Sequence, residues 1–149
     1  MRRGRRVTCA TPPPTTDIVS RTMAKALVVD DSRTTRMILA KFLRELGMDV
    51  REAANGKEAL EVIKAERATL TLILADWNMP EMNGLAMLKR LRQDPEFSSL
   101  VIVMVTAQTK IDRIAEALEA GANEYIMKPF TKEILLSKLE LAGIHSRGA

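Results

Sequence analysis

Acidic, hydroxyl and ammonium side chains stand directly after short apolar runs in this sequence of 149 residues. Asp30 and Asp31 follow the first run, Asp76 follows a later one, and Thr106 and Lys128 close two more. A carboxylate can attack phosphorus as a nucleophile, while a hydroxyl and an ammonium group stabilise charge on the oxygens of the transferred group. Together these side-chain types indicate phosphoryl transfer.

The carboxylates would need a cation if the fold brings them together. Neighbouring carboxylates raise one another's pKa unless positive charge offsets the repulsion. Magnesium prefers oxygen ligands and keeps several water molecules, so a Mg²⁺ ion held by Asp30, Asp31 and Asp76 would meet that need. The ammonium group of Lys128 would add positive charge, and the Thr106 hydroxyl could donate a hydrogen bond to the transferred group.

Each of these residues also has an ordinary structural explanation. Asp30, Asp31 and Ser32 stand before a predicted helix, where such residues commonly cap the helix and acids interact with its dipole. Asp76 could be a turn residue, Thr106 a helix cap and Lys128 a solvated surface charge. Taken singly, each ordinary explanation is the more common one, but none accounts for acids, a hydroxyl and a lysine at one edge of the same sheet.

The net charge of +4 is confined to the first part of the sequence. Of the 23 basic residues five lie within residues 1–22, and of the 19 acidic residues only one does, which leaves 18 of each in the remaining chain. That remaining part is neutral, so a basic groove for nucleic acid is not supported. We therefore expect no nucleic-acid partner.

The sequence contains one cysteine, Cys9, and one histidine, His145. These counts exclude an internal disulfide, a cysteine-rich metal site and a two-histidine metal site within one chain, and they disfavour a Ser/His/Asp triad. No apolar run approaches the roughly 20 residues of a membrane span. We expect a monomeric cytoplasmic protein that does not contact a membrane.

Composition divides the sequence into a tail and one domain. Residues 1–22 contain paired arginines, consecutive prolines and few apolar residues, so we expect a disordered basic extension. Residues 23–145 have the length and composition of a single globular domain. Residues 146–149 would form a C-terminal tail.

Within the domain, short β-prone runs alternate with segments of helical periodicity. Continuous apolar runs predict interior strands, and shorter runs interrupted by charge predict edge strands. The predicted interior strands are Ala26–Val29, Leu70–Ala75 and Val101–Val105, and the predicted edge strands are Val50–Ala53 and Glu124–Met127. The predicted helices are Thr34–Leu46, Gly56–Glu66, Leu85–Arg92, Lys110–Ala120 and Thr131–Leu141.

This strict alternation of five strand and helix units predicts an α/β fold, a doubly wound parallel sheet with helices on both faces. The interior and edge assignments favour the strand order 2-1-3-4-5, which is the order of flavodoxin-like (βα)5 folds. Functional side chains in such sheets gather at the carboxyl ends of the strands, where Asp30, Asp31, Asp76, Thr106 and Lys128 would meet.

Helix faces and helix ends can be predicted as well. Apolar residues at helical spacing predict sheet-facing stripes on the first and fourth helices. These stripes are Ile38, Leu39, Phe42, Leu43 and Leu46 on the first helix, and Ile111, Ile114, Ala115 and Leu118 on the fourth. Gly47 and Gly121 are typical of left-handed helix C-termini, and Asn55-Gly56 and Asn83-Gly84 are typical of turns.

Four motifs together make the sequence resemble the receiver domains of two-component response regulators, and among them the single-domain chemotaxis regulators of the CheY type. The motifs are LVVDDS (Leu27–Ser32), ADWNMP (Ala75–Pro80) with Gly84, VMVTA (Val103–Ala107) and YIMKPF (Tyr125–Phe130). They occur in the family's order and spacing and span residues 24–142, which is nearly the whole predicted domain.

The resemblance implies a role for each residue of the acidic cluster. Asp76 would accept the phosphoryl group, and Lys128 would contact that group. Asp31, Asp76 and the backbone carbonyl of Asn78 would bind Mg²⁺, with Asp30 acting through a water molecule.

The resemblance also implies which residues act after phosphorylation. Thr106 and Tyr125 would form the switch pair, in which Thr106 moves toward the new oxygens and Tyr125 turns inward behind it. Asn78 and Gln108 occupy positions that tune self-dephosphorylation in relatives, and because both are polar we expect a short-lived phosphoryl state. The Lys128-Pro129 peptide bond would be cis, as in the family.

By the same resemblance the protein is a signalling switch that catalyses only its own phosphorylation and dephosphorylation. His145 lies in a tail rich in Gly, Ser and Arg, so the phosphoryl donor would be another molecule, a histidine kinase. No output domain follows the last predicted helix, so the signal would pass through protein contact. The flagellar motor switch is the expected target, in chemotaxis.

Three other functions remain open. The chain could be a phosphorelay intermediate. It could also be a small Mg²⁺-dependent phosphatase with an aspartyl-phosphate intermediate, although such enzymes commonly carry a second aspartate where this sequence has Asn78. A degenerate binding module without phosphorylation is the third alternative, but every residue that the chemistry needs is present.

Overall fold

A computed structural model describes residues 24–79, 82–107 and 111–144. Within these ranges five parallel strands form one sheet in the order β2-β1-β3-β4-β5. The strands are β1 (Lys25–Val29), β2 (Asp49–Ala53), β3 (Leu70–Ala75), β4 (Val101–Thr106) and β5 (Glu124–Met127). The helices are α3 (Arg33–Glu45), α4 (Gly56–Glu66), α5 (Gly84–Arg92), α6 (Ile111–Glu119) and α7 (Lys132–Leu141), with a short 3₁₀ helix η2 (Pro95–Phe97). The predicted fold class and strand order are confirmed, and η2 is the element that the sequence pattern did not predict.

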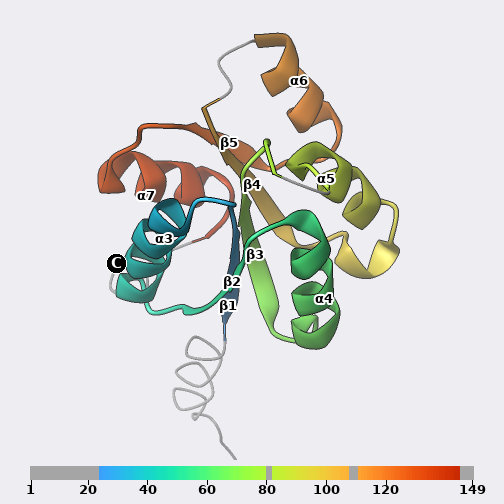
Figure 1. Ribbon diagram of the computed structural model, residues 1–149, viewed down its shortest axis with the longest axis horizontal. Helices are drawn as coiled ribbons and strands as arrows, with labels where there is room; N and C mark the ends of the chain where they lie inside the picture. The colour runs from blue at the N-terminus through green and yellow to red at the C-terminus, as the bar shows by residue number, and fades with distance from the viewer. Residues whose placement is uncertain (1–23, 80–81, 108–110, 145–149) are drawn as a thin grey trace, which may run out of the picture.

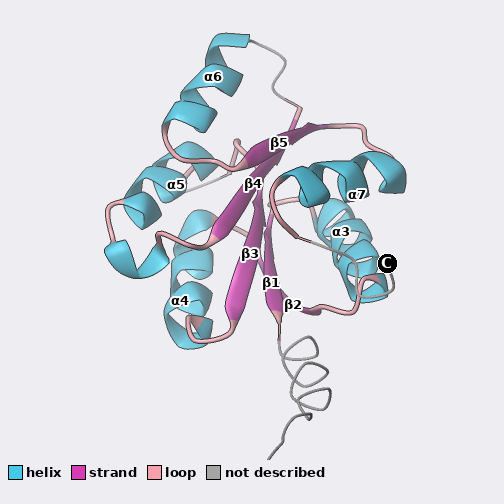
Figure 2. Ribbon diagram, turned by 180° about the vertical axis from the view of Figure 1, so that it is seen from behind, coloured by secondary structure: helices cyan, strands magenta, loops and turns pink. Residues whose placement is uncertain are grey.

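Helices cover both faces of the sheet (Figure 1). Helices α3 and α7 lie on one face and α4, α5 and α6 lie on the other, as the reverse view in Figure 2 also shows. Successive side chains of a strand point to opposite faces. Val28 therefore packs in the apolar cluster under α3 and α7, whereas Leu27 and Val29 pack in the cluster under α4 and α5. Burial on both faces explains why the interior strands are continuous apolar runs.

Parallel pairing brings the ends of distant strands to one edge of the sheet. Val29 at the end of β1 pairs with Ala75 at the end of β3. The backbone N–H of Asp76 donates to the Val29 carbonyl at 2.9 Å. Asp30 and Asp76, the next residues of each strand, therefore leave the sheet side by side.

Asn55 and Asn83 cap the helices α4 and α5, at the positions where the sequence pattern predicts turns. The side-chain Oδ1 of Asn55 accepts a hydrogen bond from the Glu58 N–H at 2.8 Å. Asn83 accepts one from the Ala86 N–H at the same distance. Each oxygen satisfies a donor of the first helical turn that has no partner within the helix. Asn55 and Asn83 are therefore the N-caps of α4 and α5, and the chain bends directly before each of these helices.

Most element boundaries agree with the prediction. The bounds of α4, β3 and β5 are confirmed, and the others differ by one residue, with Lys110 outside the described residues. Gly47 and Gly121 follow α3 and α6 with φ of 92° and 117°, the left-handed conformation expected at these helix ends. The Lys128-Pro129 peptide bond is cis, as expected.

The sheet-facing stripe predicted for α6 is wrong for most of its residues. Ile111 is 80% exposed and Leu118 is 43% exposed. Ala115 is exposed and Ile114 is half-buried, whereas Ala117 is the buried residue of this helix. Ala117 and Ile114 therefore form the inward side of this helix, whereas Ile111 and Leu118 face solvent. Periodicity identifies an apolar face, but it does not show whether the sheet or solvent lies against that face.

The stripe predicted for α3 is only partly confirmed. Leu39, Leu43 and Leu46 are buried under this helix, and Phe42 is half-buried. Ile38 is exposed and lines a groove between α3 and the loop that joins β5 to α7.

None of the helices in the described ranges is long and apolar enough to cross a membrane. The predicted disordered extension of residues 1–22 and the predicted tail of residues 146–149 lie outside the described residues, as does Gln108.

Candidate functional site

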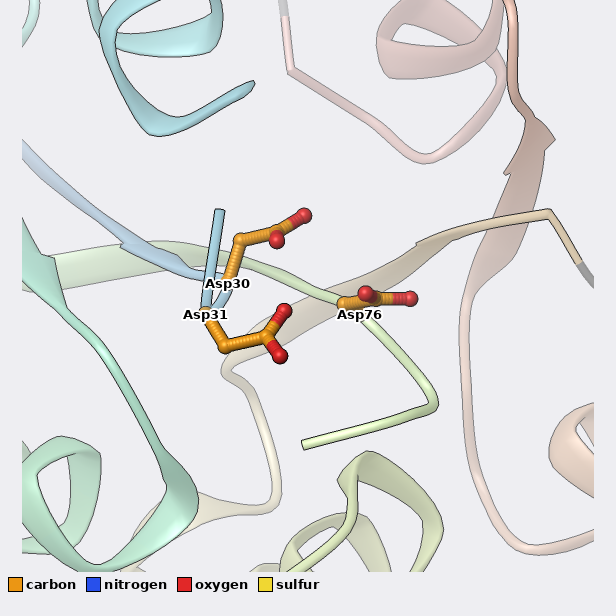
Figure 3. A group of neighbouring side chains, drawn as sticks. All are labelled: Asp30, Asp31 and Asp76. Atoms are coloured by element: carbon orange, nitrogen blue, oxygen red, sulfur yellow. The ribbon is translucent and has the colours of Figure 1, made fainter. Parts of the chain in front are cut away.

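Three carboxyl groups converge beyond the ends of β1 and β3. Ligand oxygens of Asp30, Asp31 and Asp76 lie within 4.8 Å of one another. Figure 3 shows Asp30 and Asp31 together after β1 and Asp76 after β3, with their carboxyl groups directed toward the same space. Asp30 and Asp76 are 1% and 8% exposed, whereas Asp31 is exposed. The cluster is therefore open to solvent on the side of Asp31.

Lys128 contacts two of these carboxylates from the loop after β5. Its Nζ donates to Asp30 Oδ2 at 2.7 Å and lies 3.4 Å from Asp76 Oδ2. Strand β4 separates β5 from β3 in the sheet, so the lysine side chain spans the end of β4 to reach both acids. The predicted meeting of Asp30, Asp31, Asp76 and Lys128 at one edge is thus present in the structure.

Burial raises the pKa of the Asp76 carboxyl group, which the charge of Lys128 opposes and the charge of Asp30 reinforces. Burial by itself would lower the pKa of Lys128. The hydrogen bond to Asp30 and the charges of Asp76 and Asp30 outweigh it, so the pKa of Lys128 is raised. One ammonium group is therefore shared between two buried acids, and it does not offset all of the negative charge.

The donor set of the cluster fits a hard divalent cation. Its ligands are carboxylate oxygens, which Mg²⁺ prefers over nitrogen or sulfur. The cluster is open on the side of Asp31, so a cation bound there could keep water molecules, as Mg²⁺ requires.

Ser32, and neither of the acids before it, caps α3. The Ser32 Oγ accepts from the Thr35 N–H at 3.3 Å, and the Ser32 N–H donates to Asp30 Oδ1 at 2.8 Å. Helix capping therefore does not explain Asp30 and Asp31, although it was the more common explanation for each alone.

Arg36 holds the backbone of Asp30 from the first turns of α3. Its Nη1 donates to the Asp30 carbonyl at 2.6 Å, and its Nε donates to Glu52 Oε1 at 3.3 Å. Nothing in the sequence pattern singled out Arg36. The available signal was a basic residue six positions after an acid that precedes a helix, and that signal is weak.

Thr106 ends β4 beside the acidic cluster and is 2% exposed. A cavity of about 10 Å³ lies between Thr106 and Tyr125, and Trp77, Met104, Ile114 and Ala117 complete its lining. Tyr125 is half-buried, and the Nζ of Lys138 lies 5.3 Å from the centre of its ring. Thr106 and Tyr125 thus share one small cavity.

Gly84 allows α5 to begin against the backbone of Asp76. A β-carbon at this position would lie 2.1 Å from the Asp76 carbonyl oxygen and 2.8 Å from Met104 Cε. The Gly84 N–H donates to the Trp77 carbonyl at 2.9 Å. Asn78 is exposed one residue further along the loop. The chain around Asp76 is therefore held by a close approach that only glycine permits.

The five-stranded parallel sheet and the acidic cluster at its edge define a receiver domain. Residues 26–140 match the response regulator receiver domain family, and the chain belongs to this family. The chemotaxis protein CheY1 of Helicobacter pylori is 48% identical over 118 residues, which cover 78% of this chain and 94% of that protein. The chemotaxis protein CheY-3 of Vibrio cholerae is 43% identical over 117 residues, which cover 78% of this chain and 88% of that protein.

Solved structures agree with these relatives. The chemotaxis protein CheY4 of Vibrio cholerae superposes with a TM-score of 0.71 at 37% identity, covering 79% of this chain and 97% of that one. The CheX-CheY-BeF3-Mg+2 complex from Borrelia burgdorferi gives a TM-score of 0.73 at 26% identity, covering 78% and 86%. The chain is thus a phosphoacceptor response regulator related to CheY-type chemotaxis proteins, and a small phosphatase is not favoured.

Proposed function

We propose that Asp76 is the phosphoacceptor of this switch and that its phosphorylation changes a protein-binding surface formed by α6, β5 and α7. The observation that carries the proposal is the position of the Lys128 ammonium group. It lies between Asp30 and Asp76, beside the third carboxylate of Asp31. A nucleophile, a fixed positive charge and ligands for a cation therefore occupy one point.

Contacts within the cluster favour Asp76 as the nucleophile. Both carboxylate oxygens of Asp30 are engaged, one by the Ser32 N–H and the other by Lys128. Asp31 is exposed to solvent. The contact of Lys128 with Asp76 is longer, at 3.4 Å, and burial raises the pKa of Asp76, which increases the basicity of its carboxylate.

Transfer from a phosphohistidine of a histidine kinase would proceed by direct displacement. An oxygen of Asp76 attacks phosphorus, the bond from phosphorus to the imidazole nitrogen breaks, and the imidazole keeps the electron pair and later takes a proton from water. Lys128 and the Thr106 hydroxyl donate to oxygens of the transferred group. A bound Mg²⁺, held by Asp31, Asp76 and the Asn78 carbonyl with Asp30 acting through water, would offset the remaining charge.

Hydrolysis would return the switch to its resting state. Water attacks the phosphorus of the acyl phosphate, the bond between phosphorus and the Asp76 oxygen breaks, and inorganic phosphate leaves. Asn78 and Gln108 would influence the approach of that water. The chain would therefore catalyse only its own phosphorylation and dephosphorylation. It would not turn over an external substrate.

The cavity beside Thr106 supports a switch with two states. Movement of Thr106 toward the phosphoryl oxygens would vacate space into which Tyr125 can turn. Since the present cavity of about 10 Å³ holds at most one water molecule, the ring would enter only after such a movement enlarges it. The proposed surface carries exposed apolar side chains, which are Ile111, Leu118, Met127, Ile134 and Leu141. Phosphorylation would act by shifting the population between the two states.

Phosphorylation with a small donor tests the acceptor. The native chain, Asp76→Asn and the control Asp112→Asn would be incubated with Mg²⁺ and a small acyl phosphate and compared by intact mass. Asp112 is exposed in the first turn of α6. We expect the native chain and Asp112→Asn to gain one phosphoryl group and Asp76→Asn to gain none. A native chain that gains none would refute the proposal.

Co-precipitation with and without phosphorylation tests the target. We propose a flagellar motor switch protein, because the relatives are chemotaxis proteins. Phosphate-dependent binding to the motor protein is the expected result. Transfer of the phosphoryl group onward to a histidine of another protein would instead identify a phosphorelay intermediate. The proposal places the switch in the cytoplasm as a monomer whose receiver domain spans residues 23–145.

A further inference from the structure

Arg36 makes two contacts beside the site that the proposed phosphoryl chemistry does not use. Its Nη1 donates to the Asp30 carbonyl at 2.6 Å and its Nε donates to Glu52 Oε1 at 3.3 Å. The side chain is only 16% exposed. The guanidinium group therefore links α3 to the ends of β1 and β2.

These contacts hold the peptide group that joins Asp30 to Asp31. The Asp30 N–H donates to the Ala53 carbonyl at 3.1 Å, and the Asp30 carbonyl accepts from Arg36, so both backbone groups of Asp30 are held. A peptide group is planar, and the direction of its carbonyl therefore sets the direction in which the next residue leaves. Asp31 is exposed, so packing constrains it little, and the held peptide group sets the direction in which its side chain leaves the backbone.

We propose that Arg36 is a positioning residue for cation binding: it holds the Asp30 carbonyl so that the Asp31 and Asp30 carboxylates face the cation. Glu52 in turn holds the guanidinium group. The inference rests on the proposed function, because it requires the acidic cluster to bind Mg²⁺. Residues that orient metal ligands through hydrogen bonds commonly affect metal affinity by tenfold or more.

The charge of Arg36 would act on Mg²⁺ in the opposite direction. A positive charge beside an acidic cluster repels a second cation, so removal of Arg36 would tighten Mg²⁺ binding if charge were the main effect. Positioning predicts weaker binding on removal. Arg36→Lys distinguishes the effect of charge from the effect of positioning. Lysine keeps the charge but cannot make both contacts of the planar guanidinium group.

Titration with Mg²⁺ at constant ionic strength is the test, and it needs no phosphorylation. Calorimetry and the fluorescence of Trp77, the only tryptophan and the neighbour of Asp76, report binding. The variants are Arg36→Lys, Arg36→Met and Glu52→Gln, with Arg33→Met as the control, since Arg33 begins the same helix and is exposed. We expect about a tenfold loss of Mg²⁺ affinity in both Arg36 variants and almost none in the control.

Two further measurements separate positioning from a purely structural role. The rate of phosphoryl uptake of Arg36→Lys should return to the native rate at saturating Mg²⁺, since only cation affinity is lost. The double variant Arg36→Lys with Glu52→Gln should bind Mg²⁺ no more weakly than Arg36→Lys, because both changes disturb one contact chain. If Arg36→Met does not fold, Arg36→Lys still gives the result.

Several outcomes would overturn the inference. These are unchanged or tighter Mg²⁺ binding in Arg36→Lys, an equal loss in Arg33→Met, or uptake that stays slow at saturating Mg²⁺. A native chain that binds no Mg²⁺ would instead count against the proposed function itself. If the native chain binds Mg²⁺ and the Arg36 variants bind it with the same affinity, only the role of Arg36 is refuted.

Discussion

Lys128 donates a hydrogen bond of 2.7 Å to Asp30, a residue 98 positions earlier in the chain. The Asp30 side chain is almost fully buried, and this ammonium group is its cationic partner. The same Nζ lies 3.4 Å from Asp76. Loss of the Lys128 side chain would therefore leave the buried carboxylates of Asp30 and Asp76 without their cationic partner.

Replacement of Lys128 by methionine should lower both stability and phosphoryl uptake. We expect the free energy of unfolding to fall by about 3 kcal/mol, as for other buried ion pairs that lose one partner. Added Mg²⁺ should restore part of it by supplying positive charge. Uptake should slow by about tenfold or more, because a donor to the phosphoryl oxygens is lost.

Urea unfolding with and without Mg²⁺ checks the stability of Lys128→Met, and intact mass over time checks its uptake. Lys89→Met is the matched control, since the Lys89 side chain is 53% exposed. A Lys128→Met protein as stable as Lys89→Met would contradict the shared-cation interpretation.

Asp76→Asn should stabilise the protein in the absence of Mg²⁺. Burial, opposed by Lys128, raises the pKa of Asp76 in the folded protein. Such a carboxyl group contributes stability below its unfolded pKa, and that stability is lost as the pH rises through the folded pKa. Near neutral pH the charged form therefore carries a cost. The amide should remove it and raise the free energy of unfolding by on the order of 1 kcal/mol.

The pH dependence of unfolding distinguishes this effect from better packing. The advantage of Asp76→Asn should shrink as the pH falls below the unfolded pKa of about 4, where the native carboxyl group is protonated in both states. The stability advantage of Asp76→Asn should also shrink in saturating Mg²⁺, because the ion binds and stabilises the unsubstituted protein more than the variant. An advantage that is constant with pH would show that charge is not its cause.

Gly84→Ala should disturb the backbone that carries Asp76. The added carbon would lie 2.1 Å from the Asp76 carbonyl oxygen, so α5 or the strand end must shift. We expect a loss of about 1–3 kcal/mol in stability and a slower phosphoryl uptake. Gly56→Ala is the control, because its added carbon would lie 2.7 Å from the Met82 carbonyl, away from Asp76. Equal uptake by both variants would contradict the prediction.

Thr106→Val should separate phosphorylation from switching. Valine keeps the shape of this buried side chain but removes the hydroxyl, while Asp76 and Lys128 remain in place. Tyr125 is the only tyrosine, so fluorotyrosine labelling followed by fluorine NMR reports on that ring alone. We expect the native resonance to shift on phosphorylation and that of Thr106→Val to stay. Thr71→Val, at an exposed position of β3, should behave as the native chain.

The phosphoryl state should decay quickly once the donor is removed. Asn78, two residues after Asp76, is polar and exposed, so it does not shield the acyl phosphate from water. Intact mass followed over time measures the decay, and Asn78→Val should slow it severalfold, whereas Gln93→Val on the exposed end of α5 should not. A native phosphoryl group that persists for many hours without partners would contradict the prediction.

Much of the fold could be predicted from local pattern. Apolar runs such as Leu70–Ala75 must be covered on both faces, and the alternation of strands with helices then leaves few topologies. The stripe of α6 shows where this reasoning stops. Ile111 and Leu118 have helical spacing, yet Ala117 packs against the sheet, because contact depends on how closely the helix can approach.

The site divides in the same way. The sequence alone determined which side chains meet at the site. Parallel strands place Asp30, Asp76 and Lys128 at one edge of the sheet, whatever their exact distances. Only the tertiary structure decided which acid the ammonium group contacts and that Arg36 holds the Asp30 carbonyl. These contacts depend on the twist of the sheet and on the reach of long side chains across neighbouring strands, and spacing along the chain contains neither quantity.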